Sequence, residues 1–351
     1  MHHSQINSDI RKLIAEGTVL PAHPLALTAE RQLDKTHQRA LTRYYIDAGA
    51  GGLAVGVHTT QFAIRDVGLY RPVLELAAET AASWTRRPLA LVAGLAGPTK
   101  QAVSEARTAR DIGYHAGLLS LAAMKNASED EIITHCTSVA AEIPLVGFYL
   151  QPAVGGVILS SRFWQRFASI ENVIAIKIAP FNRYRTLDVL RGVAAAGALD
   201  RVALYTGNDD HILLDLVLPF DLRDEGVTTR TYFKGGLLGH WSVWTASAVK
   251  QFERCKAARH KDSVPADLLA LDARVTDCNS AFFDVANNFH GCIAGCHEVL
   301  RRQGLMKGLW CLDTHEGLSP GQKEEIDRVT REHADLSDDA FVAANLDKWL
   351  A

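Results

Sequence analysis

The chain has 351 residues, of which 48% are hydrophobic, and its 37 basic and 40 acidic side chains give a formal net charge of −3. These values are typical of a globular protein with one large core or two modest ones. No basic stripe interleaved with aromatic residues stands out, so nucleic acid is not expected as a partner. Residues 1–18 lack the apolar centre of a signal peptide, and no apolar run reaches the about 18 residues of a membrane span. We therefore expect no membrane association and a cytoplasmic location, where the six cysteines would stay thiols.

Short apolar runs recur about every 30 residues, the length of one strand, one helix and two loops. Residues 89–93 and 173–176 are apolar throughout, as strands covered on both faces should be. Eight such runs favour a (β/α)₈ TIM barrel, although a doubly wound open sheet would also alternate strands and helices. No G-x-G-x-x-G follows a strand, which counts against a dinucleotide fold. The runs are centred on Leu25, Ala54, Leu91, Leu118, Val146, Ile176, Leu204 and, less clearly, Phe233.

Helix signals lie between the apolar runs. Thr99 can cap a helix that Gly113 ends, and Ser128 with Glu131 forms a capping box for the next helix. From about Trp244 onward strand signals disappear and helical stretches follow one another. We expect two parts without a flexible linker: residues 1–244 form the barrel with an N-terminal helical lead-in, and residues 245–351 form a helical region packed on it.

Lys177 ends the apolar run 173–176, where a buried ammonium group would be costly without a partner. Desolvation lowers the pKa of an amine and makes the neutral nucleophile available, which is the requirement for a Schiff base with a carbonyl substrate. The carboxyl ends of barrel strands face the active site. A lysine that begins a loop and extends into solvent is the alternative.

Tyr149 ends the preceding apolar run, and we expect its phenol at the same barrel face, one strand from Lys177. There it could transfer protons during carbinolamine formation and carbon–carbon cleavage. A tyrosine at the barrel rim with a hydrogen-bonded hydroxyl is the other interpretation.

Several motifs together resemble those of the dihydrodipicolinate synthase and N-acetylneuraminate lyase family. The segment 147–152, Gly-Phe-Tyr-Leu-Gln-Pro, is similar to the family's tyrosine strand, and Ala-Ile-Lys at 175–177 is similar to its Schiff-base strand. Further matches are His-Pro at 23–24, Gly-Val-His-Thr-Thr at 56–60 and Thr-Gly-Asn-Asp-Asp at 206–210. The resemblance spans about residues 20–244.

The resemblance implies a class I aldolase or lyase, usually tetrameric, in which Lys177 captures a 2-oxo acid such as pyruvate and Tyr149 relays protons. It also implies that a threonine pair, here Thr59 and Thr60, binds the carboxylate of the oxo acid, although Val57 and His58 displace the pair. We expect a small 2-oxo acid or aldehyde as substrate, a homo-oligomer (tetramer or dimer), and no cofactor. A dehydratase or decarboxylase that uses the same imine, and a non-catalytic small-molecule-binding barrel, remain as alternatives.

Two departures from the family bear on the substrate. Val154 stands where dihydrodipicolinate synthases carry an arginine for a substrate carboxylate, and residues 122–125 lack their relay tyrosine. The true dihydrodipicolinate synthase reaction is therefore not expected.

Other polar residues are weaker candidates for the site. His58 could bind substrate or transfer protons, and Asp209 could line the mouth, although a structural histidine and a helix-capping acid are the alternatives. Residues 290–297 hold two cysteines and two histidines, which could ligate zinc or form a closely packed helix of small residues. Zinc sites usually combine such a set with a distant second pair, so no metal is expected.

Overall fold

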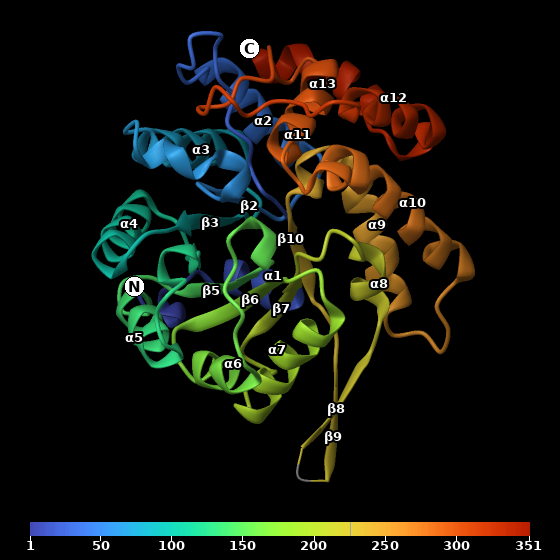
Figure 1. Ribbon diagram of the computed structural model, residues 1–351. Coiled ribbons are helices and arrows are strands. Elements are labelled where there is room, and N and C mark those ends of the chain that lie inside the picture. Colours follow the sequence, from blue (N-terminus) through green and yellow to red (C-terminus); the bar gives the residue numbers. More distant parts are fainter. Residues whose placement is uncertain (225) are drawn as a thin grey trace.

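The computed structural model describes residues 1–224 and 226–351. Eight parallel strands form one sheet in the order β1-β10-β7-β6-β5-β4-β3-β2, and a bridge between Ala22 and Ala54 brings its two edges together. The predicted (β/α)₈ barrel is confirmed, with helices surrounding the strands (Figure 1). The strands are β1 (Val19–Pro21), β2 (Gly52–Val55), β3 (Ala90–Leu95), β4 (Ala116–Leu119), β5 (Leu145–Leu150), β6 (Val173–Ala179), β7 (Ala203–Thr206) and β10 (Gly235–Leu238).

The strand predictions differ from the structure at both ends of the barrel. The first strand lies at Val19–Pro21, and Leu25 lies in the loop beyond it. The eighth strand begins at Gly235, two residues after Phe233. An antiparallel hairpin that the sequence analysis missed, β8 (Phe220–Asp224) and β9 (Val227–Thr231), projects from the barrel between the seventh and eighth strands (Figure 1).

Helices alternate with the barrel strands. Ser128 and Glu131 form the predicted capping box, and Gly113 ends its helix in the left-handed conformation that glycine adopts readily. Pro98, rather than Thr99, holds the cap position of that helix. The helices are α2 (Lys35–Asp47), α3 (Tyr70–Trp84), α4 (Thr99–Ile112), α5 (Glu129–Ala140), α6 (Ser161–Ala168), α7 (Arg183–Ala195), α8 (Ile212–Val217) and α9 (Thr245–Ala258).

The N-terminal lead-in closes the amino-terminal end of the barrel. Helix α1 (Ser8–Glu16) places Ile10 and Ile14 in the same apolar cluster as the inward side chains of the strands. The Tyr205 hydroxyl, inside the barrel, donates a hydrogen bond of 2.9 Å to the carbonyl of Ile14. Space inside the barrel therefore opens toward the carboxyl ends of the strands.

Residues of the barrel and of the C-terminal helices share one hydrophobic cluster. These helices gather along one side of the barrel, with α13 beside α2 (Figure 1). Among the described helices, none is long and apolar enough to cross a membrane. The helices beyond α9 are α10 (Ala266–Phe282), α11 (Cys292–Arg302), α12 (Gln322–Glu332) and α13 (Asp339–Leu350).

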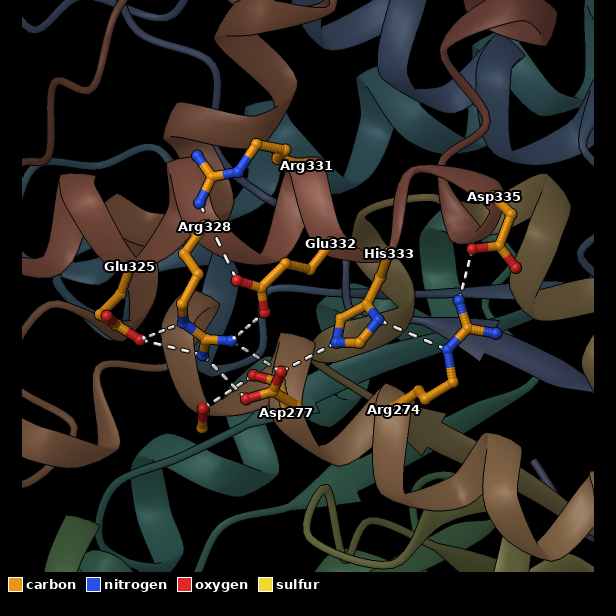
Figure 2. A network of polar contacts seen from close by, with 9 residues as sticks. Arg274, Asp277, Glu325, Arg328, Arg331, Glu332, His333 and Asp335 are labelled. Carbon is orange, nitrogen blue, oxygen red and sulfur yellow. Dashed lines mark hydrogen bonds and ion pairs between the residues drawn. The ribbon is translucent and has the colours of Figure 1, made fainter.

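A polar network fixes α12 against α10 (Figure 2). The Asp277 carboxylate accepts two hydrogen bonds from Arg328, at 2.8 and 2.9 Å, and lies 2.8 Å from His333 Nε2. The Arg328 bonds, with those of His333, lower the pKa of Asp277 to about 2. This network fixes α12 and the segment after it to α10 within the C-terminal region.

Candidate active site

A cavity opens at the carboxyl ends of the barrel strands, the position of the active site in enzymes of this fold. Barrel strands and their loops supply most of its lining, and the α10–α11 segment supplies the remainder. Its polar side chains are those of His58, Thr59, Gln151, Lys177, Asp209 and Cys292. The other lining residues are Ala22, Val57, Leu118, Phe148, Leu150, Val154, Ala179, Phe181, Gly207, Gly239, Phe283 and Phe289.

Lys177 projects into this cavity because of the alternation of strand β6. Ala175 and Ala179, two residues before and after it, pack in the barrel interior, whereas Ile176 and Ile178 pack against the surrounding helices. Gly207, directly after β7, leaves space for the Lys177 side chain, because an added Cβ there would lie 2.6 Å from Lys177 Cε.

The Lys177 amine lies in the cavity without an ion-pair partner, since within the described residues no carboxylate comes within 4.0 Å of it. Its side chain is partly exposed toward the cavity. The contact that favours its charge is the face of the Phe148 ring, whose centroid lies 4.5 Å away. Burial holds the pKa of Lys177 below its ordinary value, and the charge of Asp209 partly offsets this effect. A larger fraction of neutral amine is therefore present near neutral pH than for an exposed lysine.

Asp209 lies in the loop after β7, which a buried polar network holds in place. Asp215 accepts hydrogen bonds from Thr206 Oγ1 at 2.6 Å and from Asn208 Nδ2 at 2.9 Å. The Asp209 carboxylate itself accepts from the backbone N–H of His240 at 3.4 Å. Burial raises the pKa of Asp209, against the opposing effect of Lys177. The cavity thus contains an amine and a carboxyl group whose proton affinities have been brought toward each other.

The loop after β2 supplies His58 and Thr59 to the cavity. Burial and the charge of Lys177 lower the pKa of His58 to about 4, so its imidazole is neutral at pH 7. The backbone N–H groups of His58 and Thr59 begin a short 3₁₀ turn and make no hydrogen bond to the described residues. Both residues line the cavity.

Both threonine hydroxyls of this loop bind the protein itself. Thr59 Oγ1 donates to the carbonyl of Ala22 at 2.8 Å, and Thr60 Oγ1 donates to the carbonyl of His23 at 2.6 Å while it accepts from Gly56 N at 2.9 Å. Thr60 is fully buried and does not line the cavity. The threonine pair therefore shapes the loop, and of its two residues Thr59 reaches the cavity.

Tyr149 does not occupy the place expected for it. Phe148, not Tyr149, pairs with Lys177 across strands β5 and β6, so Tyr149 points to the opposite face of the sheet. Its ring packs 5.1 Å from Trp164 of α6, and its hydroxyl accepts a long contact of 3.5 Å from Leu159 N. The structure thus does not bring the Tyr149 hydroxyl to Lys177.

Several lining residues were missed from the sequence. The direction of Phe148 depends on the register between β5 and β6, which the sequence does not give. Phe181, Phe283 and Phe289 lie outside the regular elements, without a periodic signal, and Cys292 is the first residue of α11. Of the proposed zinc ligands at 290–297, Cys292 lines the cavity, while Cys296 and His297 are buried in α11. The pattern of a small-residue helix, rather than that of a ligand set, describes this stretch.

The fold and the cavity define a (β/α)₈ barrel with its candidate site at the carboxyl ends of the strands. Residues 17–221 match the model of the dihydrodipicolinate synthetase family, and the chain belongs to this family. Membership supports an enzyme of the class I aldolase type, a lyase. The resemblance noted in the sequence is confirmed.

Individual relatives are distant. A 4-hydroxy-tetrahydrodipicolinate synthase from Halorhodospira halophila is 24% identical over 182 residues, 52% of this chain and 58% of that protein, so the chain spans a little over half the length of this relative. N-acetylneuraminate lyase from Fusobacterium nucleatum has a TM-score of 0.70 at 17% identity, covering 91% and 99% of the two chains. The protein YagE of E. coli K12, in complex with pyruvate, has a TM-score of 0.72 at 17% identity, covering 90% and 98%. These structures share the barrel fold.

The buried amine and carboxyl group should lower the stability of the protein. We expect the double variant Lys177→Met, Asp209→Asn to have a Tm about 2 °C or more above that of the wild type, because both desolvated charges are replaced by neutral groups of similar size. Calorimetry at pH 7 measures this. Lys125→Met, at an exposed lysine, is the control and should change Tm little. A lower Tm for the double variant would mean that the pair stabilises the fold.

Proposed function

We propose that the protein is a lyase that forms a Schiff base between Lys177 and a 2-oxo acid and makes or breaks a carbon–carbon bond of the substrate. The observation that carries this proposal is the Lys177 amine, enclosed in a cavity at the carboxyl end of β6 with a lowered pKa. A neutral amine attacks the oxo carbon, and loss of water leaves the imine. The YagE structure is a complex with pyruvate, which is a small 2-oxo acid of the proposed class.

The free backbone N–H groups of His58 and Thr59 are suited to the carboxylate of the oxo acid. They come from the loop after β2 and line the same cavity as Lys177. Hydrogen bonds from two amides to a carboxylate would orient the oxo carbon toward the amine. In this proposal Thr60 acts through the shape of the loop, because its hydroxyl is held by His23 and Gly56.

Proton transfer is assigned to groups that line the cavity. Asp209 is the one carboxyl group among the described lining residues, and its raised pKa suits a group that gains and loses a proton near neutral pH. The neutral imidazole of His58 is a second polar group at the same cavity. In this proposal Asp209 takes the proton-relay role expected of Tyr149, because the Tyr149 ring packs on the side of the sheet that faces α6.

The remaining parts of the proposal follow the family. We propose that the chain assembles into a homo-oligomer, a tetramer or a dimer, and acts in the cytoplasm on a small-molecule substrate. Light scattering of the purified protein tests the assembly, and a monomeric mass at micromolar concentration would contradict it.

Borohydride reduction in the presence of pyruvate should leave a stable adduct on Lys177, located by mass spectrometry of peptides. The adduct should be lost in Lys177→Ala, whereas Lys234→Ala and Lys125→Ala should retain it. Attack requires the neutral amine, so the initial rate should rise with pH and reach half its maximum at least one unit below the ordinary lysine pKa of about 10.4. Asp209→Asn removes a charge that raises the pKa of Lys177, so it should move this midpoint to lower pH. An adduct confined to other lysines would overturn the proposal.

The proton-transfer groups can be tested with pyruvate alone. An enamine on Lys177 exchanges the methyl protons of pyruvate for deuterium in D₂O, and NMR follows the exchange. We expect Asp209→Asn to slow this exchange by about 10²-fold while borohydride trapping persists, because only the proton transfer is removed. Tyr149→Phe should stay within about threefold of the wild type. The opposite pattern, a large loss in Tyr149→Phe and none in Asp209→Asn, would assign the relay to the tyrosine.

Condensation of pyruvate with aspartate semialdehyde, the dihydrodipicolinate synthase reaction, should be slow even where imine forms. Val154 lines the cavity, and no arginine is found among the described lining residues. Without an arginine, a substrate carboxylate has no bidentate ion-pair partner. We expect this to lower kcat/KM by about two orders of magnitude relative to a site that carries an arginine. A coupled assay of the condensation measures this, and rates like those with neutral aldehydes would contradict the expectation.

A further inference from the structure

The mouth of the cavity is aromatic. Four phenylalanines, Phe148, Phe181, Phe283 and Phe289, are among the lining residues. Phe148 is buried next to Lys177, whereas the other three are partly exposed, which places them toward the opening. The rings of Phe181 and Phe289 meet edge to face, with their centroids 5.8 Å apart. Phe181 comes from the barrel and Phe289 from the C-terminal region, so the opening is bounded from both sides by aromatic rings.

Both of these phenylalanines have strained backbones. Phe181 has φ +49° and Phe289 has φ +66°, in the left-handed region that bulky side chains disfavour. Such conformations persist where the surrounding structure enforces them, and they concentrate at functional sites. Two loops from different parts of the chain thus adopt the same unfavourable backbone conformation, and their phenylalanine rings meet at one opening.

Polar contacts hold each strained loop. Phe181 N donates to Asn208 Oδ1 at 3.1 Å, which links it to the loop that carries Asp209. Phe289 N donates to the carbonyl of Asp284 at 2.9 Å. The Asp284 carboxylate, which is buried, accepts from Gly291 N at 2.9 Å and from Asn287 Nδ2 at 2.6 Å. The backbone of both phenylalanines is therefore held by hydrogen bonds within the fold.

A glycine leaves space for the ring of Phe283 at the opening. Gly239 also lines the cavity, and a Cβ at this position would lie 2.7 Å from Phe283 Cζ. Any larger residue at position 239 would displace the ring of Phe283. The barrel thus leaves space for a phenylalanine supplied by the C-terminal region.

The charges of the cavity exclude an anionic second reactant. Lys177 and Asp209 are the charged side chains of the described lining, and His58 is neutral at pH 7. In the enamine that attacks the second reactant, the Lys177 nitrogen is neutral. The charge that a second carboxylate or phosphate then meets among the described lining side chains is that of Asp209, which repels it when ionised. A polyhydroxylated group would have few hydrogen-bond partners among the phenylalanines and would lose its hydration.

We propose that the second reactant of this site is an uncharged aromatic aldehyde, which binds at the mouth among Phe181, Phe283 and Phe289. This inference rests on the proposed Schiff-base function and names its substrate class. In the synthetic direction the enamine carbon of the Lys177-bound pyruvate bonds to the aldehyde carbon, and the aldehyde oxygen takes up the proton removed from the methyl group. Water then hydrolyses the imine, restores the amine and releases a 4-aryl-4-hydroxy-2-oxo acid. The water consumed equals the water released when the imine formed.

The test compares matched aldehydes with pyruvate as the partner. Consumption of benzaldehyde, 4-carboxybenzaldehyde and glyceraldehyde is followed by chromatography, and deuterium exchange of pyruvate is measured on the same samples. We expect kcat/KM for benzaldehyde to exceed that for each of the other two by about 10²-fold or more. The Phe289→Arg variant should reverse the preference between benzaldehyde and 4-carboxybenzaldehyde, because it places a cation at the mouth. Leu269→Arg, at an exposed position of α10, should retain the wild-type ratio.

The outcomes separate this inference from the function on which it rests. Exchange of pyruvate together with a preference for glyceraldehyde or the carboxylated aldehyde, or with no reaction of benzaldehyde, overturns the aromatic assignment alone. Absence of both exchange and borohydride adduct overturns the Schiff-base proposal and this inference with it. The wild-type comparison decides the question even if Phe289→Arg fails to fold, since each preference is a ratio measured on one protein.

Discussion

The chemistry available at the barrel mouth depends on one constraint, the enclosure of the Lys177 amine. Desolvation of the ammonium group in the cavity favours its neutral form, although the face of the Phe148 ring favours the charged one, and it is the neutral form that attacks a carbonyl. The alternation of β6 sets the direction of the side chain, and Gly207 provides its space. Asp209 moderates the effect, because its charge favours the protonated amine. Burial thus lowers the pKa of Lys177 and raises that of Asp209, which brings the proton affinities of the two groups toward each other.

The C-terminal region completes the cavity and also packs on the barrel. Helices α10 and α11 are held on the barrel by the shared hydrophobic cluster, and the network around Asp277 joins α12 to α10. The segment between α10 and α11 carries Phe283 and Phe289 to the mouth, and α11 begins there with Cys292. In the proposed function, the barrel would hold the oxo acid, and the residues that meet the second reactant would come partly from the C-terminal helices. We interpret the strained Phe289 as a consequence of this arrangement.

The barrel, the capping box at Ser128 and the position of Lys177 could all be predicted from the sequence, since each follows from local periodicity or a short motif. The orientation of Tyr149 could not. Two apolar runs that are each followed by a polar residue need not present those residues to the same face of the sheet. The register shifts by a residue near Leu145 and Val146, and Phe148 then pairs with Lys177. The bonding of the Thr60 hydroxyl to His23 and the aromatic lining from beyond residue 280 depend on tertiary contacts between distant segments.

The lowered pKa of the Lys177 amine can be measured directly. NMR of protein labelled with ¹³C at the lysine ε-carbons follows the titration of each amine, and the Lys177 signal is assigned by its loss in Lys177→Arg. We expect the titration midpoint of the Lys177 amine at least one pH unit below the ordinary lysine pKa of about 10.4. A Lys177 amine that titrates with the exposed lysines would contradict this expectation, because the amine would then be solvated and protonated at neutral pH.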